Sequence, residues 1–114
     1  MDTCVFCKIV ANEIPHRRFY HDELVTAFED RSPIAPVHIL IVPNHHIESL
    51  NQAQAGDEQL FGHMLLVARQ MAAQMKLDQS GYRLVINTGP DAGQSVFHLH
   101  LHIIGGRKLS FSGQ

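Results

Sequence analysis

Three of the nine histidines in this 114-residue chain occupy alternate positions, in the run His98-Leu99-His100-Leu101-His102. Side chains on an extended strand alternate between two faces, so a strand here places the imidazoles on one face and the leucines on the other. A helix would instead spread the same rings over roughly 200° of its circumference, at about 100° per residue. The wet face of an ordinary half-buried strand carries mixed polar residues, so three aligned imidazoles need a chemical explanation.

Three interpretations fit this pattern of imidazoles. The first is structural, with the histidines packed at an interface or hydrogen-bonded in the core. The second is a metal site, because two histidines at positions i and i+2 of one strand can bind a single zinc ion. The third is covalent chemistry at phosphorus, in which one imidazole attacks while its neighbours orient it and move protons.

The segment Gly93-Gln94-Ser95, directly before the histidines, helps to decide between these interpretations. It offers backbone N–H groups, a carboxamide and a hydroxyl, which are neutral donors suited to phosphate oxygens, and glycine lets the backbone approach closely. A site for zinc alone would need a carboxylate or thiolate nearby, and this loop contains only Asp91. The donors therefore favour phosphorus chemistry over metal binding.

The rest of the chain supplies the elements that must position these residues. Apolar residues at helical spacing predict a short helix over residues 4–12 and one long helix over 55–76. Strands are predicted over residues 18–21, 24–29, 38–42, 82–87 and 96–104. This order of elements indicates an α+β fold with a mainly antiparallel sheet, and the length predicts one domain over residues 1–114.

Composition and charge narrow the classes of function. A formal charge of −2 with neutral histidines gives no basic field, which argues against a nucleic-acid partner. The sequence has no run of 18 apolar residues and no signal-peptide pattern, so we expect no membrane association and a cytoplasmic location. Isolated histidines are usually surface residues, and this is the prediction for His16, His21, His45 and His63.

The pair Cys4-Val5-Phe6-Cys7 is a weaker signal with three interpretations. In a cytoplasmic protein the two thiols are expected to be reduced or to bind metal rather than to form a structural disulfide. Thioredoxin-like redox chemistry needs a βαβ context, which the predicted elements do not include. Two buried thiols, or half of a zinc site that two histidines complete, stay open.

The run from His98 to Ile104 resembles the signature of the histidine-triad (HIT) superfamily, in which three histidines alternate with apolar residues. Gly93-Gln94-Ser95 before it and Gly105-Gly106-Arg107 after it resemble the Hint branch, the nucleoside phosphoramidases. The likeness covers nearly the whole chain and is carried further by Phe6-x-Lys8-Ile9, Glu13-Ile14-Pro15, Phe28-x-Asp30-x-Ser32-Pro33-x-Ala35-Pro36-x-His38, Val42-Pro43 and Asn87.

This resemblance implies a HIT-like fold, with a five-stranded antiparallel sheet and one long and one short helix. It implies hydrolysis of a purine nucleoside phosphoramidate through a nucleotidyl-histidine, releasing a nucleoside 5′-monophosphate and an amine, with no cofactor required for catalysis. Alternatives are a dinucleoside polyphosphate hydrolase, a non-catalytic nucleotide-binding or scaffold module, and a zinc-dependent enzyme that uses the triad as ligands.

The resemblance also assigns roles to individual residues. His100 would be the nucleophile, the carbonyl of His98 would hold its other ring nitrogen, and His38 would support the triad. The phosphate or the leaving group would be contacted by Asn87, Gly93, Gln94, Ser95 and His102, with Ser95 near the departing amine. Asp30 would accept hydrogen bonds from the ribose, and the base pocket would be lined by Val5, Phe6, Ile9 and Phe28.

Two residues of this expected pocket depart from the Hint pattern. Arg31 stands where an aliphatic residue usually packs on the base, and Glu29 stands where a histidine is common. Arg31 could stack on a purine through its guanidinium plane, or pair with Glu29 and point away. Adenine and guanine are therefore both open as the base.

By the same likeness, some bacterial HIT proteins hold a structural zinc, and the ligands here would be Cys4, Cys7, His46 and His98. Four such ligands leave no open position, which is typical of a structural ion. The resemblance also implies a homodimer, with the long helix and the strand over 82–87 near the two-fold axis. The tail over 107–114 could then reach the partner's pocket.

Overall fold

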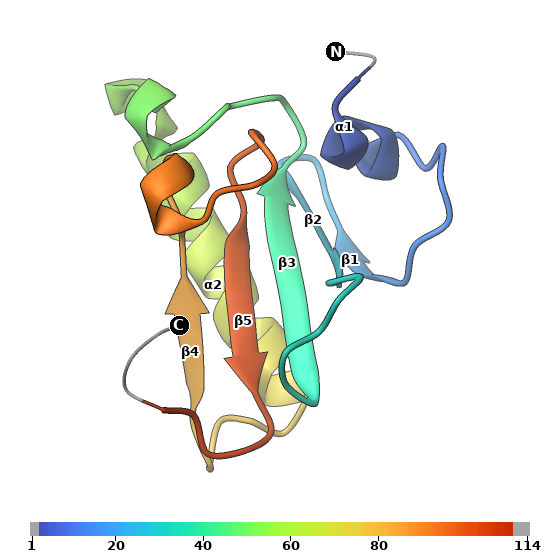
Figure 1. The fold of residues 1–114 in the computed structure, drawn as a ribbon, viewed down its shortest axis with the longest axis vertical. Coiled ribbons are helices and arrows are strands. Elements are labelled where there is room, and N and C mark those ends of the chain that lie inside the picture. The colour runs from blue at the N-terminus through green and yellow to red at the C-terminus, as the bar shows by residue number, and fades with distance from the viewer. Residues whose placement is uncertain (1–2, 111–114) are drawn as a thin grey trace.

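Five antiparallel strands form a single sheet in the computed structural model, which describes residues 3–110 (Figure 1). The strands are β1 (Arg18–His21), β2 (Val25–Glu29), β3 (Val37–Pro43), β4 (Tyr82–Val85) and β5 (Leu101–Gly105). Their order across the sheet is β1-β2-β3-β5-β4, so β5 pairs with β3 on one side and β4 on the other. The predicted α+β class with a five-stranded antiparallel sheet is confirmed.

Two α-helices pack on this sheet, α1 (Val5–Val10) and the long α2 (Glu58–Gln74), which a short 3₁₀ turn over Ala55–Asp57 precedes. Figure 1 shows α2 running behind the strands, while α1 lies beside the end of β2 and β3. Both helices are shorter than predicted. Asn12 and Lys76 each have a φ of 62°, a left-handed conformation in which an α-helix cannot continue.

The sheet buries a different apolar cluster on each face, because successive side chains of β3 and β5 alternate. The α2 face carries Ile39, Ile41, Leu99, Leu101 and Ile103, packed on Met64, Val67 and Met71 of the helix. The α1 face carries Phe28, Leu40 and Val42, packed on Phe6 and Ile9. The predicted alternation is therefore confirmed, with Leu99, Leu101 and Ile103 on the α2 face and the histidines on the other.

The histidine strand is shorter than the predicted range of 96–104, since β5 begins only at Leu101. The register that pairs Ile41 with Leu101 would place Pro43 opposite Leu99 two residues further on, and proline has no N–H to continue the ladder. The N–H of Leu99 instead donates to the carbonyl of Ile47 at 2.7 Å. His98 and His100 thus lie in a loop that enters β5, while β4 ends at Val85 rather than at residue 87.

The described part of the chain contains no helix with the length and apolar character needed to cross a membrane. Residues 1–2 lie outside the described residues, as do residues 111–114 of the predicted tail.

Candidate active site

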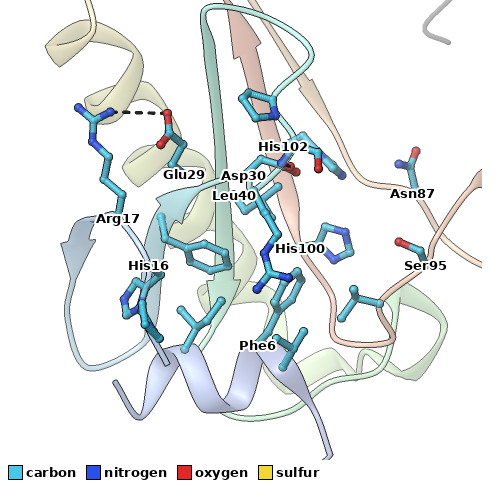
Figure 2. Close-up of a pocket in the computed structure, with 18 of the residues that line it drawn as sticks. Phe6, His16, Arg17, Glu29, Asp30, Leu40, Asn87, Ser95, His100 and His102 are labelled. Carbon is cyan, nitrogen blue, oxygen red and sulfur yellow. Dashed lines mark hydrogen bonds and ion pairs between the residues drawn. The ribbon is translucent and has the colours of Figure 1, made fainter. Parts of the chain in front are cut away.

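A cavity of about 570 Å³ opens between α1, the β2–β3 loop and the loop that enters β5 (Figure 2). Its volume lies in the range of small-molecule sites. Eleven of the predicted site residues line it: Val5, Phe6, Ile9, Phe28, Asp30, Arg31, Asn87, Gly93, Ser95, His100 and His102. The fold therefore brings together most of the residues that the sequence suggested for a nucleotide site.

His100 is 7% exposed and lies on the wall of this cavity. Its Nδ1 lies 2.7 Å from the backbone carbonyl of His98, the contact that the resemblance implied. A carbonyl only accepts hydrogen bonds, so Nδ1 carries the proton and Nε2 keeps the lone pair of the neutral ring. The ring is thus held in the tautomer in which Nε2 is a nucleophile.

His38 and His102 form a second hydrogen-bonded pair behind His100. The N–H of Ile34 donates to Nδ1 of His38 at 3.2 Å, which leaves the proton of a neutral His38 ring on Nε2. That Nε2 donates to Nδ1 of His102 at 2.9 Å, and it lies 3.4 Å from a carboxylate oxygen of Asp30. The remaining nitrogen of His102, Nε2, is buried and has no hydrogen-bond partner among the described residues.

These rings are neutral at physiological pH. Burial, together with the neighbouring His100 and His38, lowers the pKa of His102 to about 4, against an opposing effect of Asp30. Burial also lowers the pKa of His38 and of His100 from the ordinary value, while Asp30 acts in the opposite direction on both. A neutral imidazole carries one N–H, so each hydrogen bond above fixes what the other ring nitrogen can do.

The apolar end of the cavity is built from α1 and β2. The ring of Phe6 packs edge-on against Phe28, with centroids 5.4 Å apart, and against His100 at 5.1 Å. His16, predicted to be a surface residue, is half-buried here, because its ring packs on Phe28 at 6.1 Å and its Nε2 accepts from Arg18. The cavity is also lined by residues that the sequence analysis did not assign to the site: Pro15, Arg17, Ser32, Pro33, Leu40 and Val96.

A simple signal could have identified two of these missed residues. Leu40 is two positions after His38 in β3, and Val96 is two positions before His98, so period-two alternation puts both on the histidine face. Arg17 and Pro15 lie on the connection after α1, where no periodicity applies. Only the fold brings that connection to the cavity.

Gln94, predicted to contact the phosphate, has a side chain that is hydrogen-bonded to the protein backbone. Its side chain is 4% exposed and does not line the cavity. The carboxamide oxygen accepts from the N–H of Gly89, and the carboxamide nitrogen donates to the carbonyls of Glu48 and Val96, at 2.8 to 3.1 Å. Because all of these groups are satisfied by the backbone, Gln94 braces the loop that presents Ser95 and Gly93.

Arg31 and Glu29 do not pair with each other in the way that one interpretation allowed. The carboxylate of Glu29 pairs with Arg17 at 3.6 Å, as the dashed line in Figure 2 marks. Arg31 is exposed and forms part of the cavity wall. Its guanidinium is therefore placed where a bound base could meet it.

A second constellation lies behind α1, where Cys4, Cys7, His46 and His98 bring their donor atoms within 4.8 Å of one another. The distances from sulfur to Nδ1 are 3.3 Å for Cys4–His98, 3.5 Å for Cys7–His46 and 3.6 Å for Cys7–His98. Sulfur and nitrogen ligands of a tetrahedral zinc ion lie about 3.6 Å apart, given bond lengths near 2.3 and 2.05 Å. The residues therefore fit such an ion.

The orientation of His98 supports the same conclusion. The ring is fully buried, and its Nε2 donates to the carbonyl of Pro43 at 2.8 Å, which leaves the Nδ1 lone pair directed at the two sulfurs. A backbone carbonyl that orients the far nitrogen is the usual support of a metal-bound histidine. Without a metal, burial and the hydrogen bond to Cys4 raise the pKa of Cys7 to about 11.

A third group of possible ligands, Asp30, His38 and His102, also has donor atoms within 4.8 Å. Here the hydrogen bond from the N–H of Ile34 leaves the proton of His38 on Nε2, the atom that faces His102. A protonated nitrogen cannot bind a metal. These three residues are therefore a hydrogen-bonded set and not a second metal site.

Comparison with known proteins agrees with this geometry. Residues 11–109 match the HIT domain family. A purine nucleoside phosphoramidase of Escherichia coli strain K12 is 49% identical over 105 residues, which cover 92% of this chain and 88% of the relative. The crystal structure of a HIT family hydrolase from Legionella pneumophila superposes with a TM-score of 0.96 at 39% identity, covering 98% of this chain and all of that one.

A zinc-bound histidine triad family protein from Mycobacterium smegmatis has the same fold, with a TM-score of 0.85 and 34% identity over 96% of this chain and 81% of that one. The fold, the arrangement of the histidines and these similarities all point to the same protein family. This chain belongs to the histidine-triad (HIT) family.

Proposed function

We propose that this protein hydrolyses purine nucleoside 5′-phosphoramidates to the nucleoside monophosphate and an amine. The observation that carries the proposal is the tautomer of His100, whose Nδ1 is held by the His98 carbonyl at 2.7 Å on the wall of the cavity. The similarity to a relative named purine nucleoside phosphoramidase supports the choice of substrate. We further propose that residues 1–114 act as one domain.

The first step is an attack by Nε2 of His100 on the α-phosphorus. A phosphorus–nitrogen bond forms to the ring, the bond to the amine breaks, and the electron pair leaves with the amine. The ring becomes a nucleotidyl-imidazolium, whose Nδ1–H donates to the His98 carbonyl throughout. The departing amine takes a proton, for which the hydroxyl of Ser95 on the cavity wall is the proposed donor.

In the second step, water attacks the same phosphorus and the bond to Nε2 of His100 breaks. The nucleoside monophosphate keeps one proton of the water molecule, the other proton restores the Ser95 hydroxyl, and the ring returns neutral. Burial lowers the pKa of His100, so the free ring is the uncharged nucleophile at pH 7. Neutral donors around the phosphate, from Asn87, Gly93, Ser95 and His102, stabilise charge on its oxygens.

The rest of the nucleotide would occupy the apolar end of the cavity. We propose that the base packs among Val5, Phe6, Ile9 and Phe28, with the exposed guanidinium of Arg31 stacking on it. One carboxylate oxygen of Asp30 accepts from the N–H of Ser32 at 2.7 Å. The other, 3.4 Å from Nε2 of His38, is the proposed acceptor for the ribose hydroxyls.

We also propose that Cys4, Cys7, His46 and His98 hold a structural zinc ion. The four donors suit a closed tetrahedral site, and a zinc-bound relative shares the fold. When bound, the ion would fasten the first turn of α1 to the loop that enters β5. Metal analysis of protein purified without chelator tests this, and a zinc content near zero contradicts it.

A homodimer is the proposed assembly. Leu65 and Leu66 on α2 are 52% and 57% exposed, and β4 is an edge strand with Tyr82 36% exposed. Exposed apolar residues on one helix and an unpaired strand edge are features that a second subunit would cover. Light scattering after size exclusion should give twice the mass of the chain, and a monomer would exclude this arrangement.

One experiment tests the proposed reaction directly. The protein is incubated in parallel with a fluorogenic adenosine phosphoramidate, its guanosine counterpart and diadenosine tetraphosphate, and the kcat/KM values are compared. We expect the phosphoramidates to be preferred. A preference for the tetraphosphate would assign the dinucleoside polyphosphate activity instead, and binding without turnover of any substrate would indicate a nucleotide-binding module.

A further inference from the structure

The residues that follow β5 contact the loop between β2 and β3, residues 30–36. Arg107 donates from Nη2 to the carbonyl of Ile34 at 2.9 Å and from Nη1 to the carbonyl of Lys108 at 2.9 Å. One guanidinium thus spans two backbone segments that are far apart in sequence. A planar fork of this kind restrains both carbonyls with one side chain.

Gly106 reinforces this contact. Its φ is +96°, which side chains rarely adopt, and a Cβ on it would lie 2.9 Å from Cβ of Pro36. Real Cβ atoms do not approach that closely, so the backbone after β5 lies against the β2–β3 loop only because residue 106 is glycine. Gly106 and Arg107, which we call the strand exit, therefore hold the loop from two points.

The loop passes this restraint to the active site through Ile34. Its carbonyl accepts from Arg107, and its N–H donates to Nδ1 of His38 at 3.2 Å. The second bond decides which nitrogen of His38 is protonated, and Nε2 then donates to Nδ1 of His102 at 2.9 Å. His102 in turn keeps its only proton on Nε2, the buried atom that has no partner among the described residues.

We propose that Arg107 is a positioning residue that, through Ile34 and His38, fixes His102 as a hydrogen-bond donor to a non-bridging oxygen of the bound phosphate. This inference rests on the proposed function for its ligand. If the loop moves, His38 can carry its proton on Nδ1, and His102 must then donate from its own Nδ1. The lone pair of His102 Nε2 would face the phosphate oxygen and repel it.

The test compares Arg107→Ala with Lys108→Ala. The control removes the same charge from the next residue and keeps the main-chain carbonyl that Arg107 contacts. We expect Arg107→Ala to lower kcat for the phosphoramidate about tenfold, which corresponds to about 1.4 kcal/mol, and to weaken AMP binding while adenosine binding stays unchanged. Lys108→Ala should match the wild type in kcat, in AMP binding and in adenosine binding.

Two further variants separate geometry from charge. Arg107→Lys keeps the charge but loses the fork, so it should behave like Arg107→Ala. Gly106→Ala keeps Arg107, but its new Cβ would push on Pro36. This variant should therefore also bind AMP more weakly while it binds adenosine like the wild type. Wild-type behaviour of Arg107→Lys would overturn the proposal, because charge alone would then explain the effect.

The tautomer itself is measurable in the free protein. Long-range ¹⁵N–¹H correlations show which ring nitrogen of His38 carries the proton. We expect Nε2 in the wild type and in Lys108→Ala, and a mixture in Arg107→Ala. An unchanged tautomer in Arg107→Ala overturns the inference even if the enzyme is a phosphoramidase. A changed tautomer in a protein without phosphoramidase activity leaves the positioning role intact and removes only the proposed function.

Discussion

His98 and His102 lie four residues apart in one segment and face the same side of the sheet, yet their rings have different surroundings. Both nitrogens of His98 face protein groups, the Pro43 carbonyl on one side and the cysteine sulfurs on the other. His102 is bonded through Nδ1 alone, and its buried Nε2 has no hydrogen-bond partner among the described residues. One end of the segment is thus fixed to the protein, and the other end retains a donor for a ligand.

This difference shows that the residue type does not decide the role. Burial lowers the pKa of both rings to about 4, so charge does not distinguish them either. The distinction comes from what packs around each ring: α1 brings two thiols to His98, whereas the β2–β3 loop brings only His38 and Asp30 to His102. His100 lies between the two ends, with its Nδ1 on the His98 carbonyl.

The largest effect expected is from His100→Asn. The carboxamide is not a nucleophile toward phosphorus, so turnover of an adenosine phosphoramidate should fall by about 10⁴-fold or more. AMP binding, measured by calorimetry, should stay within a few-fold of the wild type. Near-normal turnover in this variant would contradict the assignment of His100 as the nucleophile.

The next effect concerns the fixed end of the segment. Cys7→Ser should abolish stoichiometric zinc and lower the free energy of unfolding by about 4 kcal/mol, the value for a ligand present at a thousandfold its dissociation constant. Urea denaturation of both proteins with matched metal analysis checks this. Equal stability of variant and wild type would mean that the four donors hold no ion in solution.

The burial of the His102 ring should be visible in the pH dependence of folding stability. The folded pKa of His102 is about 4 and the unfolded value is near 6.5, so the unfolded state binds the proton first as pH falls. The free energy of unfolding that is lost through this protonation is absent above pH 6.5 and reaches about 2 kcal/mol at pH 5. His102→Gln cannot be protonated, so its stability relative to the wild type should rise by that amount between pH 7.5 and pH 5, as measured by urea denaturation.

The smallest effect concerns the loop before the histidines. Gln94→Ala should lower stability by about 1–3 kcal/mol, because it leaves the Gly89 N–H and the Glu48 carbonyl without their partner. Ser95→Ala, at an exposed position, should leave stability unchanged but slow release of the amine in single-turnover experiments. The reverse pattern would restore Gln94 as a direct phosphate contact.

Much of the fold could be predicted because it depends on local periodicity. The alternation of apolar residues with histidines placed Leu99, Leu101 and Ile103 in the core, as the structure confirms. The ends of the strands were harder to predict from the sequence, since the start of β5 depends on Pro43 in a strand more than fifty residues earlier. The burial of Gln94 was hidden for a similar reason, because one of its partners, Glu48, belongs to a distant loop.

By itself, the sequence determined which groups are available: three imidazoles at alternate positions, two thiols one helical turn apart and a donor loop beside them. Tertiary structure alone decided which nitrogen of each ring is free, because that depends on a carbonyl or N–H from another segment. Ile34 holds His38, the His98 carbonyl holds His100, and Pro43 holds His98. A neutral imidazole has a single proton, so these contacts, which no local pattern encodes, separate the proposed nucleophile from the proposed phosphate donor and from the proposed metal ligand.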